Sequence, residues 1–132
     1  IGHGAFKNDT KIMASSRDIL EGASFLGDPH MFAHKSWPSP WPQLNVEQRN
    51  SIAYRMALVA SGEFDGAIAT QPKNDWDIAA GTLIVKEAGG IATDHLNMDF
   101  KFDNETAKQR SLVVAGKNLH PQLIKRLSHI TP

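Results

Sequence analysis

The sequence feature that most constrains the fold is an almost continuous apolar stretch over residues 76–88. It follows a polar turn at residues 71–75, carries Asp77 in its first turn and stops at the pair Gly89-Gly90. This spacing predicts one helix that is ended by glycine. A helix that is apolar nearly all round is usually covered on several sides, so we expect it to be buried within a layered fold.

Further helices and strands are predicted to alternate along the chain. Helical spacing of apolar residues predicts helices over residues 46–61 and 119–130, and short apolar runs predict strands at 11–16, 65–70, 91–93 and 112–115. Residues 94–110 form a polar excursion that we interpret as a loop. Such alternation is typical of an α/β layered sandwich.

Four prolines within residues 27–45 predict a long loop, because proline at that density blocks helix interiors and central strands. The loop carries Trp37 and Trp41. These rings either cover a pocket or subunit contact, or anchor the loop to its own core, and we expect the second role.

Composition limits the classes of partner. Lys and Arg together number 14 and Asp and Glu also number 14, so the chain has no basic excess to attract nucleic acid or anionic lipid. The apolar runs are too short for a transmembrane helix, and no cysteine is present. We therefore expect a cytoplasmic protein without nucleic-acid or membrane partners. Because the sequence starts at Ile1 without an initiating methionine, we also expect that it is part of a longer protein.

Asp77 is the candidate for chemistry on the predicted helix. Free backbone amides in a first helical turn favour negative charge, and a carboxylate fixed there could bind a hard cation. The alternative is that Asp77 only complements the helix dipole, with Asn74 or Asp75 as the cap.

The sequence Trp-Asp-Ile-Ala-Ala-Gly at residues 76–81, followed by Glu-Ala-Gly-Gly at 87–90, resembles the carboxy-terminal signature of the inositol monophosphatase superfamily. Residues 2–8 resemble the glycine-rich turn that leads from the first domain of that family, and residues 51–65 resemble the element before the signature. The resemblance implies a mixed sheet with flanking helices. It also implies that residues 1–132 are the carboxy-terminal α/β domain of a two-domain phosphatase.

The same resemblance implies two or three Mg²⁺ ions, with Asp77 as the ligand to one of them. The remaining ligands would come from an amino-terminal domain that carries a Glu-Glu pair and an Asp-Pro-x-Asp-Gly-Thr motif, and neither pattern occurs in this sequence. We therefore expect the missing amino-terminal half as a partner, a homodimer as a further association, and no complete catalytic site in residues 1–132 alone.

Three residues are candidates for contacts with a phosphorylated small-molecule substrate. Arg55 interrupts a small, apolar helix and could bind phosphate or sugar oxygens, or lie on the solvent face beside Glu47 or Glu63. Ser51 matches a pocket-lining hydroxyl residue of the family but could equally cap a helix. Thr70 is the third candidate, because the resemblance places an acidic residue of inositol-specific members at either Ala69 or Thr70 of this sequence. The implied substrate is inositol monophosphate or a related sugar phosphate, with 3′(2′),5′-bisphosphate nucleotidase activity and a non-catalytic binding or assembly module as the alternatives.

Overall fold

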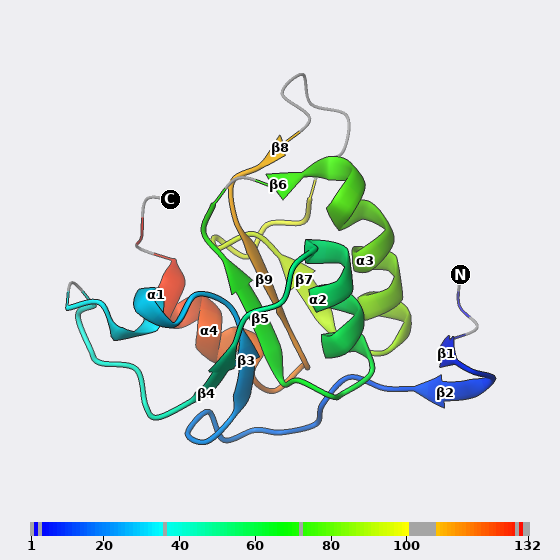
Figure 1. Cartoon of the computed structure of the whole chain (residues 1–132), viewed down its shortest axis with the longest axis horizontal. Helices are drawn as coiled ribbons and strands as arrows, with labels where there is room; N and C mark the ends of the chain where they lie inside the picture. The colour runs from blue at the N-terminus through cyan, green and yellow to red at the C-terminus, as the bar shows by residue number, and fades with distance from the viewer. Residues whose placement is uncertain are drawn as a thin grey trace.

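The centre of the fold is a five-stranded sheet in the order β4-β3-β5-β9-β7 (Figure 1). Its strands are β3 (Ser24–Leu26), β4 (Asn45–Glu47), β5 (Gly66–Ala69), β7 (Ile91–Thr93) and β9 (Leu112–Ala115). Strand β3 runs parallel to β4 and β5, whereas β9 runs antiparallel to β5 and β7. The sheet is therefore mixed, as the resemblance implies. The computed structural model describes residues 2, 4–35, 37–71, 73–100, 108–128 and 130.

Helices cover both faces of this sheet. Helices α2 (Ile52–Ala60) and α3 (Asp75–Glu87) lie on one face, and α1 (Pro29–Ala33) and α4 (His120–Leu127) lie on the other (Figure 1). Two small antiparallel sheets flank the layers. They pair β1 (Ala5–Lys7) with β2 (Thr10–Ile12), and β6 (Lys73–Asn74) with β8 (Lys108–Gln109). The α/β layered sandwich predicted from the sequence is confirmed.

Strand alternation divides the interior into two cores. On β9, Leu112 and Val114 join the core under α2 and α3, whereas Val113 and Ala115 join the core under α4. Successive side chains of a strand point to opposite faces, so a strand that is apolar at every position needs a cover on both sides. All four residues of β9 are buried, which fits its place inside the sheet.

Close packing of α2 against α3 explains a glycine in the middle of a helix. A Cβ atom added at Gly81 would lie 2.5 Å from the Sδ atom of Met56 and 2.9 Å from its Cβ atom. Met56 is fully buried in the core between the two helices. The lost helix propensity of glycine is therefore offset by the close approach of the helices that it permits.

Several predicted boundaries were wrong. The helix expected over residues 46–61 starts only at Ile52, since Val46 belongs to the edge strand β4. The strand expected at residues 11–16 ends at Ile12. The proline-rich loop over 27–45 contains the short helix α1, in which Pro29 takes the first turn where its missing N–H costs nothing. Residues 101–107 of the predicted polar loop lie outside the described residues.

The burial predicted for the helix over residues 76–88 was wrong on one side. Ile78, Gly81 and Val85 are buried, but the side chain of Trp76 is 89% exposed. Leu83 and Ile84 are 46% and 39% exposed on the same outer face. The sheet and α2 cover one face of α3 only, and within the described residues nothing covers the other.

The two tryptophans of the proline-rich loop do anchor it, as expected. The Trp37 indole Nε1 donates to the Met31 carbonyl oxygen at 2.6 Å. Trp41 makes edge-to-face contacts with Phe32 and Trp37, with ring centroids 5.0 and 5.3 Å apart. Both rings pack against the core under α4.

Within the described residues, no helix is long and apolar enough to cross a membrane.

His120, at the start of α4, links the stability of the fold to pH. It is buried, and its Nε2 atom lies 2.9 Å from the hydroxyl oxygen of Thr93. Burial lowers the pKa of His120 below its usual 6.5, while a hydrogen bond with the Val113 backbone opposes this shift. The unfolded chain then takes up a proton near pH 6.5 before the folded chain does, so this residue's contribution to stability falls as pH drops from about 6.5 through the lower folded pKa.

We expect the free energy of unfolding, measured with urea, to fall between pH 7.5 and pH 5.5 more steeply for the unmodified chain than for His120→Gln. Glutamine keeps a hydrogen-bonding group but does not titrate. Equal slopes for the two proteins would show that His120 does not carry this pH dependence.

Candidate functional site

A small cavity lies where the carboxyl ends of the parallel strands β3 and β5 meet. Its volume is about 180 Å³, and its wall includes Arg55 and Thr70, two of the residues singled out in the sequence. Residues after parallel strands meet at one sheet edge, which is where open α/β sheets bind ligands. Gly27 follows β3 in this wall, and a Cβ atom there would lie 3.1 Å from the Ile68 carbonyl oxygen. The close passage of these two backbones therefore favours glycine.

The cavity carries two cationic side chains. Arg55 is half-buried on α2, and its Nε atom donates to the Arg49 carbonyl oxygen at 2.5 Å. This bond orients the guanidinium group, and among the described residues its terminal nitrogens have no acceptor, so they can bind another one. Lys73, on β6, lines the same cavity. Arginine and lysine in one small polar cavity are suited to oxygen-rich anions.

The one carboxylate in this wall has a structural role. Asp28 caps α1, and its Oδ1 atom accepts a hydrogen bond from the backbone N–H of His30 at 2.9 Å. Its charge still partly offsets the two cations. The wall also includes Gln48, an uncharged polar group.

Ser51 lies at the N-terminus of α2 and not in the cavity wall. Its hydroxyl oxygen accepts a hydrogen bond from the backbone N–H of Tyr54 at 3.3 Å. Ser51 therefore caps the helix, which is one of the two roles that the sequence suggested for it. Ser51 also has a φ of 70°, so the chain turns sharply before the helix. Contact between Ser51 and a substrate stays a prediction.

The two aspartates of the signature helix have different surroundings. Asp75 is buried, and its Oδ1 atom accepts a hydrogen bond from the Gln109 side-chain amide at 2.8 Å, which joins α3 to β8. Asp77 is exposed in the first turn of α3, on the outer side that the chain leaves open. Asp77 is thus the carboxylate that can meet a ligand from outside.

The described residues do not assemble a complete metal site. Within them, no group of three or more His, Asp or Glu side chains is placed to hold one ion. Mg²⁺ is usually held by one or two carboxylates together with water and substrate phosphate. An exposed carboxylate with room for such partners is compatible with a partial ligand set, and the role of Asp77 as one oxygen ligand stays a prediction.

Several residues of the cavity wall were not predicted from the sequence. Asp28, Gln48 and Lys73 were interpreted as loop or helix residues, because each follows a short strand or turn that periodicity does not identify. Parallel pairing of β3 and β5 is the signal that would have found Gly27 and Asp28, since it places the residues after both strands at one edge.

Asp65 was not predicted as a site residue. It is the last residue of the segment 51–65, which resembles the family element before the signature. Its carboxylate accepts from the Ser15 hydroxyl at 2.6 Å and from the Ser24 backbone N–H at 2.8 Å. It therefore ties the start of β3 to the segment that follows β2, which is a structural role.

Comparison with known proteins gives one family model that matches, the inositol monophosphatase family, over residues 1–131. The chain is 38% identical to an inositol-1-monophosphatase of Caulobacter vibrioides, over 96% of this chain and 51% of that protein. It is 34% identical to a fructose-1,6-bisphosphatase/inositol-1-monophosphatase of Thermotoga maritima, over 98% of this chain and 49% of that protein.

Solved structures show the same similarity. The extragenic suppressor protein suhB of Bartonella henselae superimposes with a TM-score of 0.74 at 26% identity, over 98% of this chain and 50% of that one. The inositol monophosphatase of Anabaena superimposes with a TM-score of 0.78 at 22% identity, over 99% of this chain and 55% of that one, which shows the fold alone. The chain spans about half the length of the curated relatives it matches.

Proposed function

The chain belongs to the inositol monophosphatase family, and on that premise we propose that it is the carboxy-terminal half of a Mg²⁺-dependent phosphomonoesterase. The proposed substrate is inositol monophosphate or a related sugar phosphate. The observation that carries the proposal is the cavity at the ends of β3 and β5, which joins Arg55, Thr70 and Lys73 close to the start of the helix that bears Asp77.

Two accessible features of the chain, the cavity of Arg55 and Thr70 and the exposed carboxylate of Asp77, are proposed to have different roles. The polar cavity would hold the organic part of the substrate and its non-reacting oxygens. Asp77 would hold one Mg²⁺, and the bound ions would neutralise charge on the phosphate and activate water. The other metal ligands would come from the amino-terminal half, which we propose packs over the outer face of α3.

One observation favours a second candidate substrate, a bisphosphate. Two cations line the cavity, and neither Ala69 nor Thr70, the two candidates for the acidic position of inositol-specific members, carries a charge. A second phosphate on the substrate would compensate this positive charge better than a neutral inositol ring would. The Thermotoga maritima relative, whose name includes both fructose-1,6-bisphosphatase and inositol-1-monophosphatase, supports keeping both candidates.

Phosphate release with Mg²⁺ by the chain joined to its amino-terminal half tests both candidates. The substrates are inositol 1-phosphate, fructose 1,6-bisphosphate and adenosine 3′,5′-bisphosphate. We expect Arg55→Gln to raise KM for the preferred bisphosphate about tenfold and to change KM for the monophosphate much less, because one charge-assisted hydrogen bond to the second phosphate is lost.

Arg49→Gln is the matched control. Its guanidinium group is already bonded to the Glu47 carboxylate at 2.8 Å and to the Gln48 carbonyl oxygen at 2.9 Å, outside the cavity wall. It should leave every KM unchanged. Equal effects of Arg55→Gln on all three substrates would contradict the bisphosphate candidate, and no Mg²⁺-dependent release from any of them would contradict the proposed function.

A further inference from the structure

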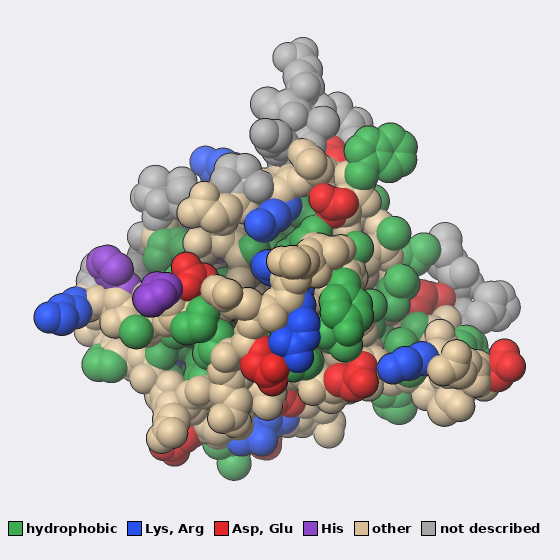
Figure 2. Space-filling model, viewed as in Figure 1, with side chains coloured by type: hydrophobic (Ala, Val, Ile, Leu, Met, Phe, Trp, Pro, Cys, Tyr) green, Lys and Arg blue, Asp and Glu red, His purple; other side chains and the backbone are tan. Residues whose placement is uncertain are grey.

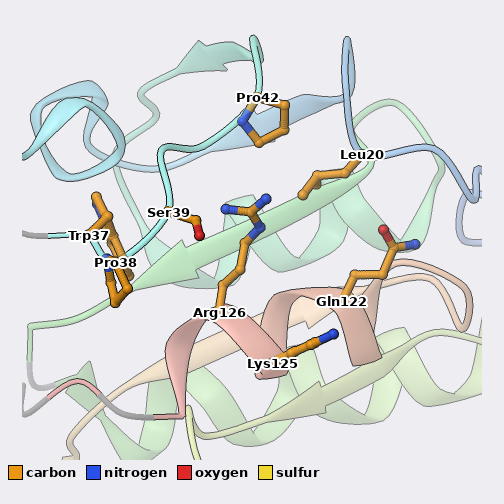
Figure 3. Close-up of a pocket in the computed structure, with 8 residues that line it drawn as sticks. All are labelled: Leu20, Trp37, Pro38, Ser39, Pro42, Gln122, Lys125 and Arg126. Carbon is orange, nitrogen blue, oxygen red and sulfur yellow. The ribbon is translucent and has the colours of Figure 1, made fainter.

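A larger cavity lies on the α4 side of the sheet, between this helix and the proline-rich loop. Its volume is about 560 Å³, within the usual range for small-molecule sites. Figure 3 shows Trp37 and Pro38 at one end, Pro42 and Leu20 along the other side, and the Arg126 side chain rising from α4 into the space between them. The cavity shares none of its wall with the cavity of Arg55 and Thr70.

The charged part of this wall is cationic only. Lys125 and Arg126 both line the cavity, and within the described part of the chain neither has a carboxylate within 4 Å. Arg126 lies with its guanidinium carbon 5.0 Å from the centre of the Trp41 ring, and its Nη1 atom donates to the Pro40 carbonyl oxygen at 3.2 Å. Among the described residues its other terminal nitrogen has no hydrogen-bond acceptor, so it can bind a ligand. Lys125 is exposed beside it.

The apolar part of the wall is held in place by the loop. The indole bond from Trp37 to Met31 fixes one edge of the ring, and Trp37 packs edge-on against Trp41. Pro38 and Pro42 restrict the backbone on either side, because proline fixes φ. The Trp37 ring and the Arg126 guanidinium group therefore keep their relative positions without a ligand, which lowers the ordering cost of binding one.

A structural role explains only part of this arrangement. Basic residues in the last turn of α4 complement the helix dipole, and Arg126 also ties the loop to the helix. Neither role accounts for a cavity of this size beside an oriented indole ring and a lysine that has no carboxylate partner among the described residues.

We propose that this cavity binds a small aromatic carboxylate, with its ring against Trp37 and its carboxylate between Arg126 and Lys125. An aromatic ring can pack against the Trp37 and Pro38 end of the cavity, and a carboxylate supplies the negative charge that its wall lacks. The site is independent of the proposed phosphatase function and needs neither the metal nor the amino-terminal half.

Titration of the ¹⁵N-labelled 132-residue chain with 2-naphthoate tests the proposal. The indole N–H signals of the tryptophans are the readout, and Trp76, on the outer face of α3, is the internal control. We expect the Trp37 signal to shift saturably with a Kd of about 1 mM or below, and the Trp76 signal to stay in place. 2-Naphthylmethanol, which keeps the ring without the charge, and acetate, which keeps the charge without the ring, should each bind at least fivefold more weakly.

Two variants assign the binding to the cations. Lys125→Gln removes an exposed group that has no partner among the described residues, and it should weaken binding of 2-naphthoate two- to fivefold. Arg126→Gln should weaken it about tenfold. The control is Lys117→Gln, at an exposed lysine that does not line the cavity, and it should change nothing. Arg126→Lys keeps the positive charge, so it serves as the variant to use if the loop needs that charge to stay folded. It should bind 2-naphthoate more tightly than Arg126→Gln does. An unmoved Trp37 signal at about 10 mM 2-naphthoate, equal binding of the alcohol, or unchanged affinity in both glutamine variants would overturn the proposal.

Discussion

Replacing Asp77 with asparagine should reduce Mg²⁺-dependent phosphate release by the joined protein about a hundredfold or more. Asparagine has nearly the same size, keeps one carbonyl oxygen and removes the negative charge, so the substitution tests ligation rather than packing. Metal assistance contributes several kcal/mol to phosphoryl-transfer transition states, and each 1.4 kcal/mol or so corresponds to a factor of ten in rate. The exposed position of Asp77 means that folding should be unaffected.

Asp75→Asn is the matched control, because it makes the same chemical change two residues away. Asp75 is buried against Gln109 and has no access to the open side of α3. Its substitution should therefore lower the melting temperature and leave the Mg²⁺ dependence of the activity nearly unchanged. A titration of activity with Mg²⁺ separates the two effects. The Asp77→Asn curve should shift to higher Mg²⁺ concentration, and the Asp75→Asn curve should keep its midpoint.

Residues 1–132 alone should release no phosphate from any of the three substrates, because the described residues hold no group of three acidic or histidine ligands. Substantial turnover by this chain, or an Asp77→Asn protein as fast as the unmodified one, would place the chemistry at residues other than those proposed.

The sequence predicted those elements whose signal is local. Helices α3 and α4 are each defined by apolar spacing within the helix, and β5, β7 and β9 are short apolar runs between clear turn residues. The signature around Asp77 identified the family, which the match over residues 1–131 confirms.

The elements that were missed depend on contacts between distant residues. Strands β3 and β4 contain three residues each, too few for any periodicity, and they form because β4 pairs with β3 across the proline-rich loop and β3 also pairs with β5. Val46 was predicted to lie in a helix because the apolar residues that follow it have helical spacing, whereas its pairing with β3 cannot be recognised from the local sequence. The residues of the site differ in the same way, since some have a local sequence signal and others are brought together only by strand pairing. Arg55 and Thr70 were found individually, but Lys73 and Asp28 become part of one wall only through the pairing of β3 with β5.

The outer face of α3 leads to the second large expected effect. We expect the isolated chain to self-associate with rising concentration, and the variant Leu83→Gln/Ile84→Gln to remain monomeric in sedimentation. Figure 2 shows hydrophobic side chains gathered on the side of the molecule where α2 and α3 lie. Trp76, Leu83 and Ile84 share the outer face of α3 and are between 39% and 89% exposed. Burying a half-exposed Leu or Ile contributes about 1 kcal/mol, so removing two from each copy of a symmetric pair should weaken association more than tenfold.

The variant Ile19→Gln/Met98→Gln is the control for apolar exposure as such. These two side chains are 63% and 56% exposed, more than Leu83 and Ile84, but they lie outside α3. If α3 is the surface that its amino-terminal half covers, the α3 variant should also lose most of the activity recovered when the two halves are mixed, whereas the control variant should recover it fully. Self-association that the two double variants reduce equally would mean that apolar exposure in general drives it. Full recovery of activity by the α3 variant would mean that the amino-terminal half packs elsewhere on this chain.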